Sequence, residues 1–143
     1  MQIIVDTREQ LPLWETTRQT LIVGDYTTKK LKGIFHIERK SLSDLYGTLT
    51  SGNQRFKYEL FRAAYNNIQL PVYVEGSYSN FVNKRFPKGS DRKFSTEGLI
   101  RLIATFERKY FLEFVWASNR AACRQAVQKR LQYEENRLKR PKK

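Results

Sequence analysis

The chain has 143 residues and carries 27 Lys and Arg against 14 Asp and Glu, a formal net charge of +13. This length suits one domain with its own core, and the basic excess favours a polyanionic partner, nucleic acid before membrane. Cys123 is the single cysteine, which excludes an internal disulfide, and no apolar run reaches the roughly 20 residues that cross a bilayer.

The same composition would also result from a solvated basic surface that serves solubility alone. The N-terminus enters a strand pattern directly, without the charged region that begins a signal peptide. We therefore expect an intracellular protein without a membrane partner, in the cytoplasm or nucleoid of a bacterium or phage, or in the nucleus of a eukaryote.

Apolar periodicity predicts alternating strands and helices, with a loop over residues 10–20. Ser41-x-x-Asp44 has the form of a capping box that starts the first helix. In chain order, we expect strands over residues 2–7, 21–30, 34–40, 70–75 and 111–116, and helices that begin at Ser41, after Gly52, at Ser95 or Thr96, and near Ser118.

The strand over residues 34–40 ends in Glu38-Arg39-Lys40. Because successive side chains of a strand alternate between its faces, Glu38 and Lys40 point to the same side and Arg39 to the other. A carboxylate beside an ammonium group at a strand end can hold a divalent cation and activate a water. The pair is also common on protein surfaces, where it forms an ion pair of small energetic value.

Thirteen residues before Glu38 stands Gly24-Asp25-Tyr26, after an apolar run. G-D followed by E-R-K-x-x-x-D resembles the signature of the XPF-type structure-specific endonucleases, named for xeroderma pigmentosum group F. Residues 5–9, V-D-T-R-E, match the D-x-R-E of that family. Gly52 followed by Arg55-Phe56 is similar to its next segment, although here Asn53-Gln54 separate the glycine from the arginine.

The resemblance implies an α/β restriction-endonuclease-like fold, a central mixed β-sheet flanked by helices. It implies a metal-dependent DNA endonuclease that cuts branched, flap or junction structures and works as a homodimer or heterodimer. Mg²⁺ is the expected cofactor, because it prefers one or two carboxylates with water and phosphate oxygens, and Mn²⁺ is expected to substitute. Two other functions stay open: a catalytically silent DNA-binding partner subunit, and a same-fold nuclease that resolves junctions or degrades DNA generally.

Site roles follow residue by residue from the same resemblance. Asp25, Glu38 and the backbone carbonyl of Arg39 are the expected metal ligands. Lys40 would orient the attacking water or stabilise the pentavalent phosphorus. Arg8 and Arg55 would grip the scissile phosphate or the carboxylates beside it. The expected catalytic residues are Asp25, Glu38, Lys40, Asp6, Arg8 and Asp44, with Glu9 as a candidate addition to the acidic cluster.

Each assignment has a plainer alternative. Asp25 can be a turn residue after Gly24, Asp44 can be a helix cap only, and Arg8 can serve a structural ion pair. What favours catalysis is the joint occurrence of these residues in the order and spacing of the family.

Residues 76–94 show no clear period and mix basic side chains with aromatic ones. Such a segment suits phosphate contact with base stacking, or it is a surface loop whose aromatic rings pack against the core. Its candidate DNA-binding residues are Lys84, Arg85, Lys88, Arg92 and Lys93. We expect residues 1–143 to form a single nuclease domain with a basic helical segment from about residue 118, and we find no helix-hairpin-helix pattern in the sequence.

Overall fold

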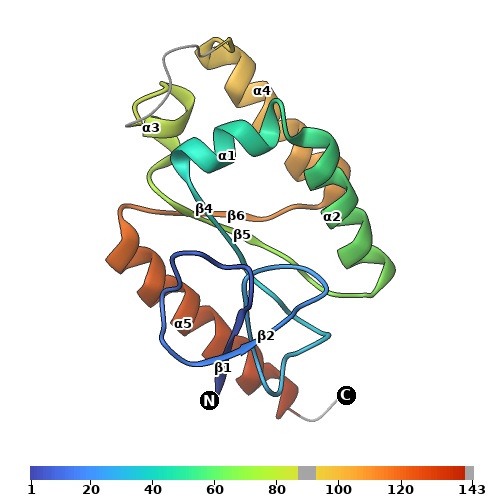
Figure 1. Ribbon diagram of the computed structural model, residues 1–143. Coiled ribbons are helices and arrows are strands. Elements are labelled where there is room, and N and C mark those ends of the chain that lie inside the picture. The colour runs from blue at the N-terminus through green and yellow to red at the C-terminus, as the bar shows by residue number, and fades with distance from the viewer. Residues whose placement is uncertain (87–92, 141–143) are drawn as a thin grey trace.

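Two three-stranded sheets organise the computed structural model, which describes residues 1–86 and 93–140 (Figure 1). In the first sheet the order is β2-β1-β3, with β1 parallel to β2 and antiparallel to β3. In the second sheet the order is β4-β5-β6, and all strands are parallel. The strands are β1 Ile3–Asp6, β2 Thr17–Gln19, β3 Tyr26–Thr28, β4 Glu38–Ser41, β5 Val72–Glu75 and β6 Phe114–Ala117.

The two sheets meet where β3 approaches the segment before β4. Tyr26 and Ile37 form an antiparallel bridge and exchange backbone hydrogen bonds of 3.0 and 2.8 Å. The fold is therefore the expected mixed α/β arrangement with helices flanking strands, and its strands form two sheets joined at this bridge. The junction matters for function because it brings the start of β3 to the start of β4.

The helices lie on both sides of the β4-β5-β6 sheet. Figure 1 shows α1, α2 and α4 on one side and α5 on the other, beside the first sheet. Val72 and Val74 of β5 pack into the core under α1, α2 and α4, whereas Tyr73 packs into the core with α5, which confirms the predicted alternation along this strand. The helices are α1 Leu42–Leu49, α2 Asn53–Tyr65, α3 Tyr78–Val82, α4 Thr96–Tyr110 and α5 Arg120–Leu138.

The N-terminal strands differ from the sequence prediction. The strand expected over residues 21–30 is reduced to β3, and β2 forms inside the expected loop. Gly24 turns the chain at φ +79°, a conformation that favours glycine, and a Cβ there would lie 2.9 Å from Leu70 Cδ1. Residues 21–25 therefore form a turn that presents Asp25 at the bridge, whereas the apolar pattern at this position indicates a strand.

The helix starts follow the predicted capping chemistry. Ser41 Oγ accepts from the Asp44 N–H at 3.1 Å and begins α1, and Ser95 caps α4 in the same way. Asn119, one residue after the expected start, caps α5. Cys123 lies buried on α5, and burial raises the pKa of its thiol to about 12, as expected for a packing residue. Among residues 1–86 and 93–140, no helix is long and apolar enough to cross a membrane.

Candidate active site

The carboxyl groups of Asp25 and Glu38 meet at the junction of the two sheets. The Asp25 N–H donates to Ile37 O at 2.8 Å, and the Arg39 N–H donates to Asp25 Oδ2 at 2.8 Å. These bonds hold the Asp25 side chain beside Glu38, the first residue of β4, and the two carboxyls come within hydrogen-bonding contact. The structure thus brings together the two acids that the sequence predicts as metal ligands.

This pair of acids is electrostatically strained. Burial raises the pKa of Asp25 well above its ordinary value, and the negative charges of Glu38 and Glu9 raise it further, against the opposing hydrogen bond from the Arg39 amide. Glu38 is only 6% exposed. Two neighbouring carboxylates in such a place require a proton or a cation between them.

Lys40 supplies one positive charge to the cluster. Its Nζ lies 3.1 Å from Glu38 Oε2, on the same side of β4, as strand alternation predicts. Burial would lower the pKa of Lys40, but the carboxylates of Glu38 and Asp25 outweigh burial and raise it. The ammonium group is therefore held in its charged form beside the acids.

Glu59, on α2, is a third acid of the cluster, and the sequence motif does not predict it. Burial and the charge of Glu38 raise the pKa of Glu59 to about 7, and its side chain contacts that of Glu38. Glu59 Oε1 is buried and has no hydrogen-bond partner among the described residues. The one available signal was its position four residues after Arg55, which places both side chains on neighbouring turns of one helix side.

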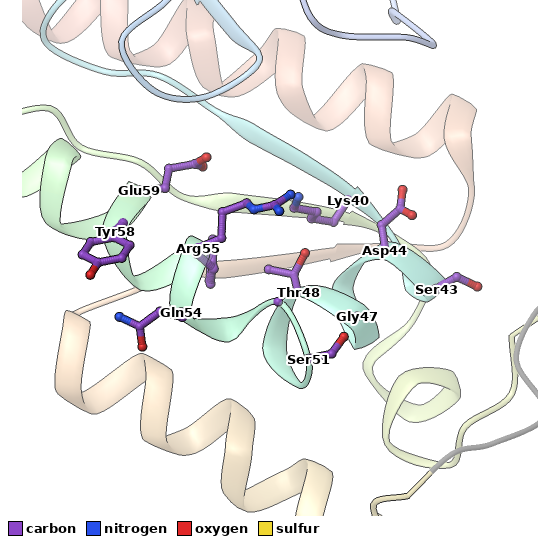
Figure 2. A pocket seen from close by; sticks show the side chains of 12 residues that line it. Lys40, Ser43, Asp44, Gly47, Thr48, Ser51, Gln54, Arg55, Tyr58 and Glu59 are labelled. Carbon is purple, nitrogen blue, oxygen red and sulfur yellow. The ribbon is translucent and has the colours of Figure 1, made fainter.

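An open pocket of about 900 Å³ lies in front of this cluster (Figure 2). Lys40 and Glu59 both line it, and the side chains of both contact Glu38 of the acid pair. No side chain caps the N-terminus of α2 at Gly52, on the pocket rim, which leaves the positive end of this helix dipole available to an anion. The pocket is lined by Lys40, Ser43, Asp44, Gly47, Thr48, Ser51, Gly52, Gln54, Arg55, Phe56, Tyr58 and Glu59.

Arg55 and Asp44 both reach this pocket. Figure 2 shows Lys40 from β4 and Arg55 from α2 directed toward the same middle part of the pocket. Asp44 is exposed on the first turn of α1 at the pocket edge. The extra residues between Gly52 and Arg55 are the first residues of α2, and Arg55 still enters the pocket where phosphate would lie.

Asp6 and Arg8 bind each other through their side chains, and Asp6 meets Asp25 through the backbone, where the Asp6 N–H donates to Asp25 O at 2.8 Å. Asp6 Oδ2 accepts from Arg8 Nε at 2.9 Å, and Asp6 Oδ1 accepts from the Leu21 N–H at 2.8 Å. Burial would raise the pKa of Asp6, but the hydrogen bonds from Arg8 and Leu21 lower it. Asp6 therefore anchors the turn that carries Asp25, and Arg8 remains close enough for its charge to act on Asp25 and Glu59.

Glu9, the candidate addition to the acidic cluster, adds its negative charge near Asp25 and binds two further partners. Glu9 accepts from Arg39 Nε at 2.9 Å and from the Tyr26 hydroxyl at 3.0 Å. The Arg39 side chain extends to the opposite side of β4 from Lys40 and also binds Glu75 at 2.8 Å. Glu9 is therefore neutralised by Arg39, and these bonds tie the N-terminal loop to β4 and β5.

Three of the basic residues expected to bind DNA before α4 lie outside this pocket. Lys84 and Arg85 follow α3, and the Lys93 N–H donates to the hydroxyl of Tyr46 on the core side of α1. None of these three side chains lines the pocket. Phe81 and Phe86 pack against the core, which favours the structural interpretation of the aromatic rings at these two positions. Lys88 and Arg92 lie outside the described residues.

The donor set fits a hard divalent cation. Within the described part of the chain, no three His, Cys, Asp or Glu side chains form a complete metal cage. Mg²⁺ needs no such cage, because it takes one or two carboxylates and fills its other positions with water and phosphate oxygens. Asp25 and Glu38 supply two adjacent oxygen donors, and the side chain of Glu59 contacts that of Glu38.

Comparison with known proteins places these observations in a family. A family model described as the ERCC4 domain matches residues 2–123. Among solved structures, XPF from Aeropyrum pernix superimposes with a TM-score of 0.71 at 19% identity, covering 96% of this chain and 67% of that one. XPF from Aeropyrum pernix in complex with DNA gives 0.73 at 19% identity, covering 94% and 65%. The chain thus spans about two thirds of these relatives and shares their fold, while no curated protein matches it significantly.

Proposed function

The chain belongs to the ERCC4 domain family, and we propose that it is a metal-dependent endonuclease that hydrolyses phosphodiester bonds of DNA at branches, flaps or junctions. The observation that carries this proposal is the contact between Asp25 and Glu38 beside the Lys40 ammonium. A fold scaffold alone would have no need for adjacent carboxylates whose mutual repulsion destabilises it.

In this proposal Asp25 and Glu38 hold one Mg²⁺, or Mn²⁺ in its place, with the backbone carbonyl of Arg39 as a third protein ligand. This is supported by the position of the Arg39 backbone at the acid pair, where its N–H donates to Asp25 Oδ2 at 2.8 Å. The bound ion would lower the pKa of a water molecule and act as a Lewis acid on the phosphoryl oxygens. Glu59 is placed to accept a hydrogen bond from such a water through its unpartnered Oε1.

The other pocket residues would position the sugar-phosphate strand. Lys40 keeps its proton beside Glu38 and can donate to the attacking water or to the charged phosphoryl oxygens. Arg55 offers a planar guanidinium to a phosphate that enters the pocket from the open side. Arg8, whose charge reaches Asp25 and Glu59, would hold the acidic residues in place.

DNA as the substrate is supported by the net charge of +13 and by the similarity to an XPF structure in complex with DNA. Recognition by backbone charge and shape suits a basic surface without a sequence-reading element. We further propose an intracellular site of action, where DNA is present, and assembly into a dimer with a second copy or another subunit.

The test is cleavage of four labelled substrates of equal length: a flap, a fork, a four-way junction and a linear duplex. Wild type, Asp25→Asn and the matched control Glu107→Gln, which removes an exposed acid on α4, are each incubated with Mg²⁺ and with EDTA. We expect wild type and the control to cut the branched substrates only with metal. Asp25→Asn should bind all four and cut none.

Each other result selects an alternative. Binding by wild type without cleavage, in every metal, would identify a catalytically silent partner subunit. Equal cutting of the plain duplex would identify a general DNA-degrading enzyme, and cutting confined to the four-way junction would identify a resolvase. Cleavage in EDTA would refute the metal mechanism itself.

A further inference from the structure

The outer side of α2 presents aromatic rings that the rest of the described chain leaves uncovered. Tyr58, Phe61 and Tyr65 are 61%, 68% and 78% exposed, and the rings of Phe61 and Tyr65 stack with centroids 6.3 Å apart. Their spacing of three and four residues places them along one helix side, which we call the aromatic stripe. Contiguous exposed apolar surface of this kind marks an interaction site.

The aromatic stripe is continuous with the candidate active site. Tyr58 lines the pocket beside Arg55 and Glu59, so the first ring of the stripe forms part of the pocket wall (Figure 2). Phe61 and Tyr65 continue from it toward the C-terminus of α2. A strand that leaves the pocket along α2 would therefore pass over all three rings in turn.

Two basic side chains of α2 lie alongside the aromatic stripe, on its edge nearer the pocket. Arg55 and Arg62 lie three residues before and four residues after Tyr58, and both are exposed. Arg62 Nε donates to Ile22 O at 3.3 Å, in the turn that leads to Asp25. The guanidinium groups thus lie between the aromatic stripe and the acidic cluster, where the phosphates of a strand would run if its bases faced the rings.

We propose that the aromatic stripe stacks the unpaired bases of a single DNA strand that leaves the catalytic pocket. This inference rests on the proposed function and specifies its substrate as one with an unpaired arm. Every base has a π face, so stacking on Tyr58, Phe61 and Tyr65 would be independent of sequence. The rise of about 1.5 Å per helical residue spreads the three rings over about 10 Å, the length of about three base steps.

A second copy of this chain is the competing occupant, because it would also cover an apolar helix side. A two-fold contact through the stripe would bring Arg55 and Arg62 of one copy toward the same residues of the other, and both copies carry a large positive charge. A polyanionic strand neutralises these arginines instead. Charge complementarity therefore favours DNA over self-association at this surface.

The test compares binding of a single-stranded oligothymidylate and of a duplex of the same length by fluorescence anisotropy in EDTA, which separates binding from cleavage. The variants are Phe61→Ala with Tyr65→Ala, the same pair changed to leucine, and the ring-preserving pair Phe61→Tyr with Tyr65→Phe. Tyr133→Ala, an exposed tyrosine on α5, is the matched control.

We expect the alanine and leucine pairs to weaken single-strand binding by about tenfold to a hundredfold and duplex binding by less than twofold. The ring-preserving pair and Tyr133→Ala should bind the single strand and the duplex as wild type does. If the alanine pair folds poorly, the leucine pair and the ring-preserving pair still provide the comparison. The proposal would be overturned if the alanine pair bound the single strand as tightly as wild type, or lost affinity equally for both DNAs. It would also be overturned if the leucine pair kept full single-strand affinity, or if wild type were a dimer that the alanine pair converts to a monomer.

This result is separable from that of the proposed nuclease activity. Loss of single-strand binding in the stripe variants supports the stripe even if wild type cuts no substrate. Conversely, wild type could cut DNA only with metal, Asp25→Asn could fail to cut, and the stripe variants could bind as wild type does. That result would support the proposed nuclease activity and refute the role of the aromatic stripe.

Discussion

Glu38 and Glu59 meet through their side chains, although Glu38 is the buried first residue of β4 and Glu59 lies on the pocket side of α2. The contact joins the acid pair at the sheet junction to the wall of the open pocket. It also brings the side chain of Glu59, whose buried Oε1 has no hydrogen-bond partner among the described residues, to the Glu38 carboxylate. Lys40 pairs with this carboxylate but is a single positive charge among several acids. This relationship leads to testable consequences for pH, stability and binding.

The first prediction concerns the pH dependence of stability without metal. Glu59 has a pKa of about 7 in the fold and about 4.5 in the unfolded chain, so the folded protein holds a proton that the unfolded chain releases. The free energy of unfolding should therefore fall as pH rises between these values, by about 2 kcal/mol from this group. Glu59→Gln should remove that part of the fall, as measured by urea unfolding in EDTA at pH 5 and pH 8.

His36 contributes with the opposite sign, because burial lowers its pKa in the fold and the unfolded chain keeps the proton to higher pH. Its contribution is present in wild type and Glu59→Gln alike, so the difference between the two proteins isolates Glu59. Parallel pH profiles for the two proteins would contradict the raised pKa.

The second prediction is that Asp25→Asn stabilises the metal-free protein while it abolishes cleavage. The substitution removes the repulsion between Asp25 and Glu38 and keeps an oxygen that can accept from the Arg39 amide. We expect the Tm in EDTA to rise by about 2–5 °C and the cleavage rate with Mg²⁺ to fall at least about a thousandfold, because several kcal/mol of metal catalysis is lost. A lower Tm would show that Asp25 serves the fold.

The third prediction separates Asp6 from the catalytic acids. Asp6→Ala leaves the buried Leu21 N–H without its acceptor and frees Arg8, so the free energy of unfolding should fall by about 2–3 kcal/mol. Arg8→Ala should cost about 1 kcal/mol or less, because the Arg8 side chain is largely exposed. Urea unfolding measures both. An Asp6→Ala protein with wild-type stability and no cleavage would instead assign Asp6 to catalysis.

The fourth prediction concerns the buried Arg39 network. Arg39→Met leaves Glu9 and Glu75 without their shared cation, and the free energy of unfolding should fall by about 3–5 kcal/mol. Adding Glu9→Gln and Glu75→Gln should restore part of this loss, because both carboxylates are then replaced by uncharged amides, while Arg120 loses its ion pair with Glu75. No recovery in the triple variant would show that shape, rather than charge, makes Arg39 necessary.

The fifth prediction distinguishes the arginine in the pocket from the basic residues outside it. Lys84→Ala with Arg85→Ala should weaken binding equally for all DNAs and lower the slope of log K against log salt by about one unit for each phosphate that is no longer neutralised. Arg55→Ala should reduce the cleavage rate more than the binding constant. Anisotropy titrations at several salt concentrations and single-turnover cleavage provide the two measurements. An unchanged salt slope would exclude Lys84 and Arg85 from the DNA interface.

Local structure was largely predictable because it depends on neighbours within a few residues. The capping of α1 by Ser41 and the opposite faces of Tyr73 and Val74 both follow from short-range periodicity. The strand expected around Gly24 was wrong, because hydrogen bonding to distant Asp6 and the positive φ of the glycine override an apolar run.

By itself, the sequence determined the positive charge, the order of the strands and helices other than β2 and α3, and a motif in which Asp25, Glu38 and Lys40 share one site. The tertiary structure alone decided which acids meet: Glu59 joins Glu38, whereas Asp6 and Glu9 are neutralised by Arg8 and Arg39. The reason is physical. Periodicity states which way a side chain points from its own element, but contact and desolvation, and hence the charge a carboxyl carries, depend on where separate elements pack.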